Sequence, residues 1–237
     1  MQPPETDFGD DIAVPAAVTA LAEGRPLTPI WRNVLGGLTY RIGSDYFVKF
    51  APRGSNLPLR NEASRLAWAA RYTPVPEVVS SGSDETGEWL VTRAINGWSA
   101  VDKRWDKATA VTAIAAGLKE LHHGVPVKEC PFDWSVERRL GEVDRGKIGD
   151  PPAIDRLVVC QGDPCAPNTL IGPDGRWVAH VDLAALGVAD RWADLAVASY
   201  SLSWNYGDGW EDLFFATYGI DPDPERIAYY RLLWDLG

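Results

Sequence analysis

Residues 158–171 read VVCQGDPCAPNTLI, and the interpretation of the whole chain starts from this stretch. The β-branched pair Val158-Val159 predicts a strand that runs into a tight turn at Gly162. Two prolines follow Asp163, and because they fix φ they predict a loop that does not become a helix. Asn168 ends this loop, five positions after Asp163.

A further acidic residue follows across a predicted hairpin. Thr169–Ile171 and Trp177–Val181 predict two short strands joined by the turn Pro173-Asp174-Gly175. Asp182 lies at the end of the second strand. Phosphoryl transfer from ATP needs such a set: one carboxylate receives the hydroxyl proton, while an amide oxygen and a second carboxylate hold Mg²⁺ on the phosphates. The alternative, for each position taken singly, is a solvated turn residue.

The segment Gln161–Asn168 resembles the His-Gly-Asp-x-x-x-x-Asn loop of the aminoglycoside phosphotransferases, which share the protein-kinase-like fold. Residues 181–196 resemble that family's metal-binding aspartate and the helix after it. Segments at 130–132 and 218–221 resemble its 3′-phosphotransferase branch, and the similarity runs from about Trp31 to the C-terminus. The resemblance implies an α+β, two-lobed protein-kinase-like fold. Its N-terminal lobe would have a five-stranded antiparallel sheet with one helix, and its mostly helical C-terminal lobe would carry a catalytic hairpin.

The resemblance divides the chain into a nucleotide-binding lobe, residues 1–95, and a catalytic and acceptor-binding lobe, residues 96–237. Residues 1–28 predict a loose lead-in with a short helix at Pro15–Glu23 that Gly24 ends. The alternation of apolar segments and turns predicts a three-stranded meander and two further strands. These five strands are expected at Ile30–Leu35, Leu38–Ile42, Tyr46–Phe50, Glu77–Ser81 and Glu88–Thr92.

Lys49 lies in the third predicted strand, and Glu62 lies in the helix that follows the loop Pro52–Pro58. A lysine in a strand is often a solvated residue on an outer face. A strand lysine that faces a helix glutamate, however, is how kinases hold an amine on the α- and β-phosphates. Lys49 and Glu62 are therefore candidates for this pair. The resemblance further implies that adenine would contact the backbone at Thr92 and Ala94.

Several helices are expected in the C-terminal lobe. Apolar residues at helical spacing predict a core helix from Thr109, closed by Gly124, whose last turn favours His122 and His123. Further helices are expected from Cys130 to Leu140, then at Asp190–Trp204, Trp210–Tyr218 and Pro224–Leu236.

Four positions and one segment depart from the family pattern. Gln161 replaces the loop's usual histidine, and Ala185 stands where the 3′-phosphotransferases usually have an arginine. Trp204 and Trp234 occupy positions that usually offer carboxylates to the aminoglycoside, which leaves Asp235 as an acceptor-side acid. Residues 141–152 are short where the family has a longer, acidic, mostly helical insertion.

Composition restricts the partners. The formal net charge of −10 argues against nucleic acid or an anionic membrane and suits a cationic small molecule. Three cysteines without Cys-x-x-Cys spacing predict neither a disulfide framework nor a zinc site. No apolar segment approaches the length of a membrane span, and residues 1–11 lack an apolar signal region, so a cytoplasmic protein is expected.

The expected function is an ATP-dependent (or GTP-dependent) and Mg²⁺-dependent O-phosphotransferase of the antibiotic-resistance type, with an aminoglycoside as the acceptor. Asp163 would be the catalytic base, Asn168 and Asp182 would hold the metal, Lys49 would hold the phosphates, and Glu62 would hold Lys49. Two alternatives remain open: a small-molecule kinase with another acceptor, and a nucleotide-binding relative without catalysis.

Overall fold

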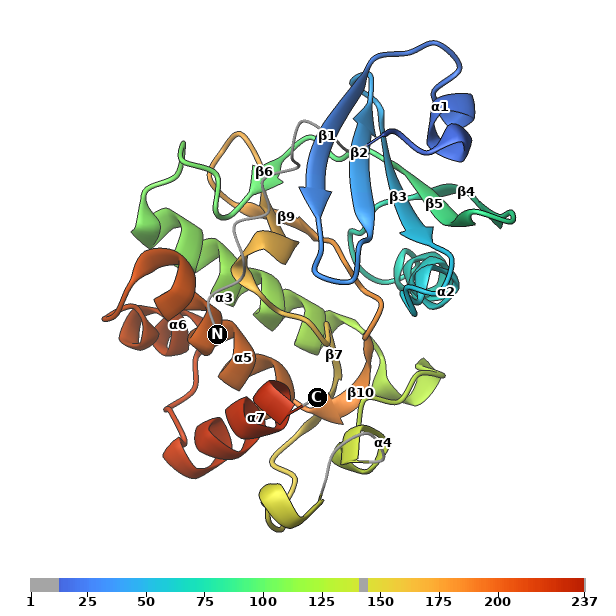
Figure 1. The fold of residues 1–237 in the computed structure, drawn as a ribbon. Helices are drawn as coiled ribbons and strands as arrows, with labels where there is room; N and C mark the ends of the chain where they lie inside the picture. Colours follow the sequence, from blue (N-terminus) through green and yellow to red (C-terminus); the bar gives the residue numbers. More distant parts are fainter. Residues whose placement is uncertain (1–12, 141–144, 237) are drawn as a thin grey trace. The chain divides into compact units, whose positions relative to one another are not determined.

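The computed structural model describes residues 13–140 and 145–236 of the 237-residue chain. These residues fold as two compact units (Figure 1). The sheet unit comprises residues 13–70 and 76–95, and the helical unit comprises residues 71–75 and 96–236.

The sheet unit contains a five-stranded antiparallel sheet in the order β1-β2-β3-β5-β4. Its strands are β1 (Leu27–Arg32), β2 (Leu38–Ile42), β3 (Tyr46–Pro52), β4 (Val78–Ser83) and β5 (Gly87–Arg93). The predicted five-stranded sheet is confirmed, but β1 ends at Arg32 instead of Leu35. Asn33 explains this end, because its Oδ1 accepts the N–H groups of Leu35 and Gly37 and holds the chain in a turn.

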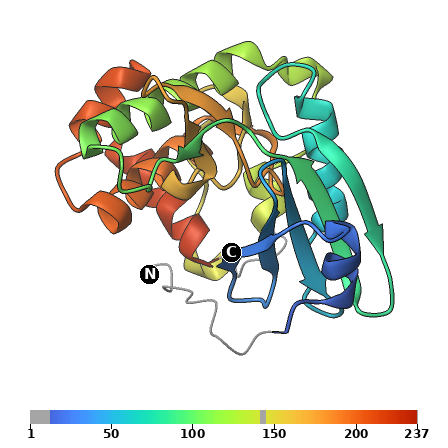
Figure 2. The same cartoon turned by 90° about the horizontal axis from the view of Figure 1, so that it is seen from above.

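The two helices of this unit, α1 (Ala16–Ala22) and α2 (Leu59–Ala69), contact different faces of the sheet. Alternate strand residues point to opposite faces. Val48 of β3 is buried in one cluster with Val18 and Ala22 of α1, whereas its neighbour Lys49 reaches α2. Figure 2 shows the same strands and helices from a second side. The expected short helix is confirmed, but the expectation of a loose lead-in is wrong for residues 16–28, because α1 completes the core and β1 starts at Leu27.

The helical unit carries five helices and two small sheets within its described residues. The helices are α3 (Lys107–Gly124), α4 (Val136–Leu140), α5 (Trp192–Tyr206), α6 (Glu211–Tyr218) and α7 (Pro224–Leu236). The sheets pair β10 (Gly187–Asp190) with β7 (Leu157–Cys160), and β6 (Trp98–Ser99) with β8 (Thr169–Ile171) and β9 (Trp177–His180). The predicted hairpin is β8–β9.

Two boundaries in the helical unit differ from the sequence expectation. Helix α5 starts at Trp192 because the Asp190 side chain accepts the Trp192 N–H group from outside the helix. Residues 130–135 are not helical, because Phe132 and Trp134 exchange backbone hydrogen bonds with Val188 of β10. Strand β10 itself was not predicted. Its four residues are too few to show a period.

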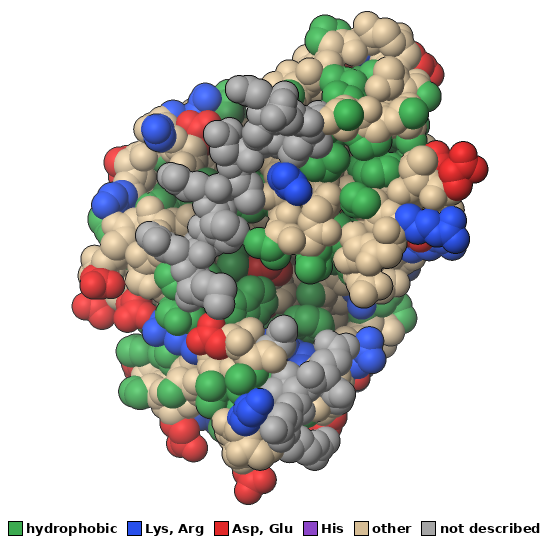
Figure 3. Space-filling model, in the orientation of Figure 1, with side chains coloured by type: hydrophobic (Ala, Val, Ile, Leu, Met, Phe, Trp, Pro, Cys, Tyr) green, Lys and Arg blue, Asp and Glu red, His purple; other side chains and the backbone are tan. Residues whose placement is uncertain are grey.

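The core of the helical unit forms around α3 and α5. Val111, Ile114 and Leu118 of α3 are fully buried, as the spacing predicted. Among the described residues, no helix is long and apolar enough to cross a membrane. Acidic and basic side chains are interspersed on the face shown in Figure 3.

Candidate active site

Strand β7 leads the chain into the turn that carries Asp163. Gly162 has φ +90°, and a Cβ built there would lie 2.3 Å from the carbonyl oxygen of Ala185. The left-handed backbone and this close approach both require glycine. The turn that follows Asp182 therefore packs directly against the loop of Asp163.

The carboxyl group of Asp163 is suited to accept a proton. Its Oδ1 atom is buried and, within the described residues, has no hydrogen-bond partner. Burial, and then the negative charge of Asp182, raise the pKa of Asp163 to about 6. A buried carboxylate oxygen without a donor can receive a hydrogen bond, and then the proton, from a bound hydroxyl group.

Backbone contacts hold Asn168 and Asp182 beside Asp163. Asn168 Nδ2 donates to the carbonyl oxygen of Asp163 at 2.9 Å, and the Val181 N–H group donates to the carbonyl oxygen of Asn168 at 2.9 Å. Asp182, next to Val181, has φ +60°, a left-handed conformation that Asp and Asn adopt more readily than other side chains. The structure thus brings together the three residues that the sequence singled out.

This cluster has the chemistry that a magnesium ion requires. Mg²⁺ prefers oxygen ligands from carboxylates and carbonyl groups. Asp182 offers a carboxylate, and Asn168 offers its amide oxygen because its Nδ2 atom is engaged with the Asp163 carbonyl. The residues present therefore fit the ion.

Asp194, a buried aspartate of α5, holds the loop before Asp163 through hydrogen bonds to its backbone. Asp194 Oδ2 accepts the N–H group of Gln161 at 2.6 Å, and its Oδ1 accepts that of Gly162 at 3.0 Å. His122 of α3 places Nε2 at 3.0 Å from the same Oδ2, and its Nδ1 lies 2.8 Å from the hydroxyl oxygen of Tyr218. The side chains of Asp194 and His122 have no solvent exposure. The backbone before Asp163 is therefore fixed by helices of the core.

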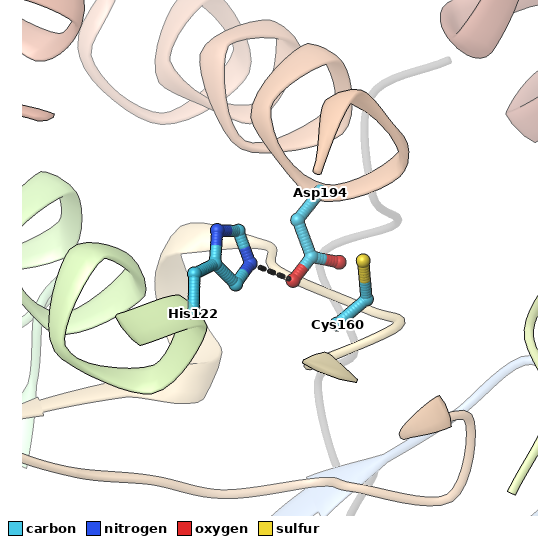
Figure 4. A group of neighbouring side chains, drawn as sticks. All are labelled: His122, Cys160 and Asp194. Atoms are coloured by element: carbon cyan, nitrogen blue, oxygen red, sulfur yellow. Dashed lines mark hydrogen bonds and ion pairs between the residues drawn. The ribbon is translucent and has the colours of Figure 1, made fainter. Parts of the chain in front are cut away.

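His122, Cys160 and Asp194 place potential metal-ligating atoms within 4.8 Å of one another (Figure 4). Burial, together with the charges of Asp194 and Asp190, raises the pKa of the Cys160 thiol well above its ordinary value, which disfavours the thiolate that binds metals. Both carboxylate oxygens of Asp194 already accept hydrogen bonds. We therefore interpret this cluster as a hydrogen-bonded anchor. His122 and His123 do lie in the last turn of α3, as expected, but the sequence did not reveal the buried contacts of His122.

In the sheet unit, Lys49 of β3 and Glu62 of α2 form a direct ion pair. Lys49 Nζ lies 2.7 Å and 2.9 Å from the two carboxylate oxygens of Glu62. The Glu62 side chain is 4% exposed and that of Lys49 is 27% exposed, so Glu62 is the more deeply buried partner of the pair. The pair predicted from sequence is present.

The remaining predicted residues have less specific surroundings. Thr92 lies in β5, and the Ala94 N–H group donates to the carbonyl oxygen of Asp45 at 2.7 Å. An adenine contact through that N–H group would compete with this bond. Asp235 is exposed near the end of α7. The shortened segment 141–152 lies partly outside the described residues, and its described part contains one 3-10 turn, Arg145–Lys147.

Sequence reasoning gave no role to Asp194, although a signal was present. Between Trp192 and Leu202, α5 is almost uniformly apolar, and Asp194 is its one acidic residue. An ionised residue on a fully buried helix requires partners. That pattern identifies Asp194 as a structural or functional anchor, but it does not identify the N–H groups that it accepts.

Known proteins are similar to this chain in sequence and in fold. The model of the phosphotransferase enzyme family matches residues 30–146. An aminoglycoside 3′-phosphotransferase of Streptomyces fradiae is 34% identical, over 80% of this chain and 84% of the relative. A streptomycin 3″-kinase of Streptomyces griseus is also 34% identical, over 78% and 82%.

A solved structure agrees with these matches. An aminoglycoside phosphotransferase from Streptomyces rimosus, in complex with ADP and streptomycin, has a TM-score of 0.73 and 25% identity, over 93% of this chain and 97% of that one. The predicted α+β kinase-like fold is therefore confirmed. The chain belongs to the aminoglycoside phosphotransferase family of phosphotransferase enzymes.

Proposed function

We propose that this protein transfers the γ-phosphoryl group of ATP to a hydroxyl group of an aminoglycoside. The observation that carries the proposal is the buried Oδ1 of Asp163, which has no donor among the described residues and lies beside Asn168 and Asp182. A protein that only bound nucleotide would not require an acceptor oxygen kept free of hydrogen bonds at this position.

Asp163 acts on the acceptor. Its Oδ1 atom takes the hydrogen bond of the acceptor hydroxyl, orients that oxygen toward the γ-phosphorus and receives the proton as the new P–O bond forms. The bond from the γ-phosphorus to the β–γ bridging oxygen breaks in the same transfer, and ADP leaves. The Asp194 anchor and Gly162 hold the loop, so the carboxylate does not have to reorganise during the reaction.

Asp182 and Asn168 would hold Mg²⁺ through a carboxylate and an amide oxygen. The ion, when bound, supplies positive charge that stabilises the phosphates during transfer. Within this chain, the hydrogen bond from Asn168 Nδ2 to the Asp163 carbonyl oxygen fixes the metal ligand in position relative to the base.

The sheet unit would hold the nucleotide, in agreement with the expected division at residues 1–95 and 96–237. Lys49 would contact the phosphates, and Glu62 would restrict the amine to one direction. Of the adenine contacts expected at Thr92 and Ala94, one through the Ala94 N–H group requires its bond to Asp45 to open. ADP in the Streptomyces rimosus structure supports ATP as the donor, in preference to GTP. A donor of this kind and three cysteines without a disulfide fit a cytoplasmic enzyme.

A second acceptor class is favoured by one observation on α5. The Trp204 ring lies 4.3 Å from the Tyr200 ring, centroid to centroid, and the Arg231 guanidinium lies 5.0 Å from the Tyr200 ring centroid. Arg231 is also ion-paired with Glu211, so this surface, which we call the aromatic wall, presents rings and a neutralised charge pair. Such a surface attracts a polycationic sugar less than unpaired carboxylates do. Asp235 remains an exposed acid that an ammonium group can reach. A less cationic alcohol would fit such a wall.

Turnover with Mg·ATP tests both candidates. We would measure ADP release and identify the phosphate monoester with kanamycin, neomycin, streptomycin and uncharged sugar alcohols as acceptors. The proposal expects Mg²⁺-dependent product from at least one aminoglycoside. Tight ATP binding without product from any alcohol would instead identify a non-catalytic relative.

The dependence on salt separates the acceptor classes. If few carboxylates contact the acceptor, the KM for kanamycin should be poor and should rise only slightly with ionic strength, because few exposed charge pairs are screened. The Streptomyces fradiae relative assayed alongside is the control. A low-micromolar KM with a steep salt dependence would support the polycationic acceptor and exclude the aromatic-wall alternative.

A further inference from the structure

Gln161 is the residue at which the loop departs from the family pattern, and its side chain is completely buried. Its Nε2 atom donates to the carbonyl oxygen of Val181 at 2.9 Å and lies 3.3 Å from that of Asp182. Its Oε1 atom accepts the Asp163 N–H group at 2.6 Å. One amide group therefore contacts both the residue expected to be the base and the segment that carries the metal ligand.

These contacts close a ring of four hydrogen bonds. The Asp163 N–H group donates to Gln161, Gln161 donates to Val181, Val181 donates to Asn168, and Asn168 donates to the Asp163 carbonyl oxygen. Two of the four bonds belong to the Gln161 side chain. The ring surrounds the backbone of the base and of one metal ligand, and it adjoins the second ligand, Asp182.

We propose that Gln161 is a positioning residue for phosphoryl transfer: its amide sets the distance between the Asp163 loop and the strand that presents Asp182. This inference rests on the proposed function. The chemistry of the side chain supports it, since an amide has a donor and an acceptor that act simultaneously on two segments. Asp182 holds a left-handed backbone, which persists only where its surroundings fix it, and Gln161 contacts its carbonyl oxygen.

The test replaces Gln161 by side chains that keep or lose the two bonds. Gln161→Met keeps the length but loses donor and acceptor, whereas Gln161→His has both in a neutral ring. We expect Gln161→Met to lower kcat about 100-fold, the loss that follows when a catalytic group is displaced by about 1 Å. We also expect it to weaken the Mg²⁺-dependent part of ATP binding about tenfold, as loss of an outer-shell partner does. ATP binding without Mg²⁺ should remain unchanged, and Gln161→His should recover most of kcat.

Tyr206→Phe is the matched control, because it removes one buried hydrogen bond, to the Ala100 carbonyl, from the same unit without touching the ring. A wild-type kcat in Gln161→Met, or equal losses of ATP affinity with and without Mg²⁺, would overturn the proposal. If Gln161→Met does not fold, Gln161→Asn replaces it. Its amide is one methylene too short to reach both segments, and a wild-type kcat there would contradict the proposal equally.

Amide hydrogen exchange tests the ring even if no acceptor is turned over. In Gln161→Met the Asp163 N–H group should exchange at least about tenfold faster, because it loses its acceptor, Gln161 Oε1. The neighbouring Gly162 N–H group, which donates to Asp194, should remain protected and serves as an internal control. Faster exchange at Asp163 in an enzyme without turnover would contradict the proposed function but not the ring. Unchanged exchange would contradict the ring itself.

Discussion

The two units hold their candidate residues in different ways. In the sheet unit, Lys49 and Glu62 contact each other directly through opposite charges. In the helical unit, Asp163 and Asn168 are held through main-chain atoms, and the group that anchors their loop is the buried Asp194 of a distant helix. The Lys49–Glu62 pair depends on one contact between two side chains. The Asp163 loop is held by a helix of the core, so its position depends on the packing of the whole helical unit.

The largest expected effect is on the helical unit. Asp163→Ala should lower kcat by about 10²–10⁴, because the acceptor hydroxyl loses its base. The affinity for ATP should change little, since Lys49 and the metal ligands are intact. Steady-state kinetics with parallel ATP titration measure both quantities. Retention of more than about a tenth of the wild-type kcat would remove Asp163 from the base role.

The second largest effect should follow from removing the charge of Asp194, which lowers the free energy of unfolding. Asp194→Asn retains one acceptor oxygen but weakens the bonds to Gln161, Gly162 and His122, each to a group that has no access to water. Hydrogen bonds to charged groups contribute about 1.5–3 kcal/mol each, so we expect a loss of about 3 kcal/mol or more. Urea unfolding followed by circular dichroism measures the loss. A variant as stable as the wild type would show that the loop does not need the anchor.

The corresponding change in the sheet unit should act on binding instead of folding. Glu62→Gln leaves the amide of the new side chain close to Lys49 but removes the charge that orients the amine. We expect the Kd for ATP to rise about tenfold, the equivalent of one charge-assisted hydrogen bond. Unfolding should change by less than about 1 kcal/mol, because the Lys49 side chain is partly exposed and its charge can be screened by water. If Glu62→Gln destabilises as strongly as Asp194→Asn, the contrast between the units does not hold.

A surface ion pair of the helical unit should give the smallest effect. Asp155 accepts hydrogen bonds from Arg191 Nε at 2.6 Å and from Trp192 Nε1 at 2.9 Å, and the Arg191 bond contributes most to a lowered pKa for Asp155. A carboxylate whose pKa is lowered by folding stabilises the folded state at pH values above its unfolded-state pKa, near 4. This stabilisation is lost as the pH falls through its folded-state pKa. Asp155→Asn should therefore cost about 1 kcal/mol at pH 7, and the difference from wild type should shrink in acid. A difference that grows toward acid would contradict this sign.

The sequence singled out the residues proposed to perform chemistry but not the residues that support them. Asp163, Asn168, Asp182, Lys49 and Glu62 were recognisable because their spacing and side-chain types match what phosphates and Mg²⁺ require. Asp194 accepts backbone N–H groups and contacts His122, and any well-packed helix pair can present such contacts. Their role depends on which buried helices meet, which no local pattern encodes.

The same reason explains the errors in the fold. The five strands of the large sheet alternate with clear turns, so their pairing was predictable. Helix α1 is followed by β1, which begins at Leu27. The burial of α1 depends on Val18 packing against one face of the sheet, whose strands come after α1 in the sequence. Strand β10 exists because Val188 pairs with β7 and with the segment near Phe132. Both depend on tertiary contacts.

The most direct test of the central claim is a titration of ATP into the wild type and Asp182→Asn, with and without Mg²⁺. Asparagine tolerates the left-handed backbone at this position, so the substitution removes the charge and leaves the turn. If Asp182 and Asn168 hold the metal on the phosphates, the variant should lose at least about tenfold in ATP affinity with Mg²⁺ and almost nothing without it. Equal losses under both conditions would reduce Asp182 to a structural turn residue and contradict the account.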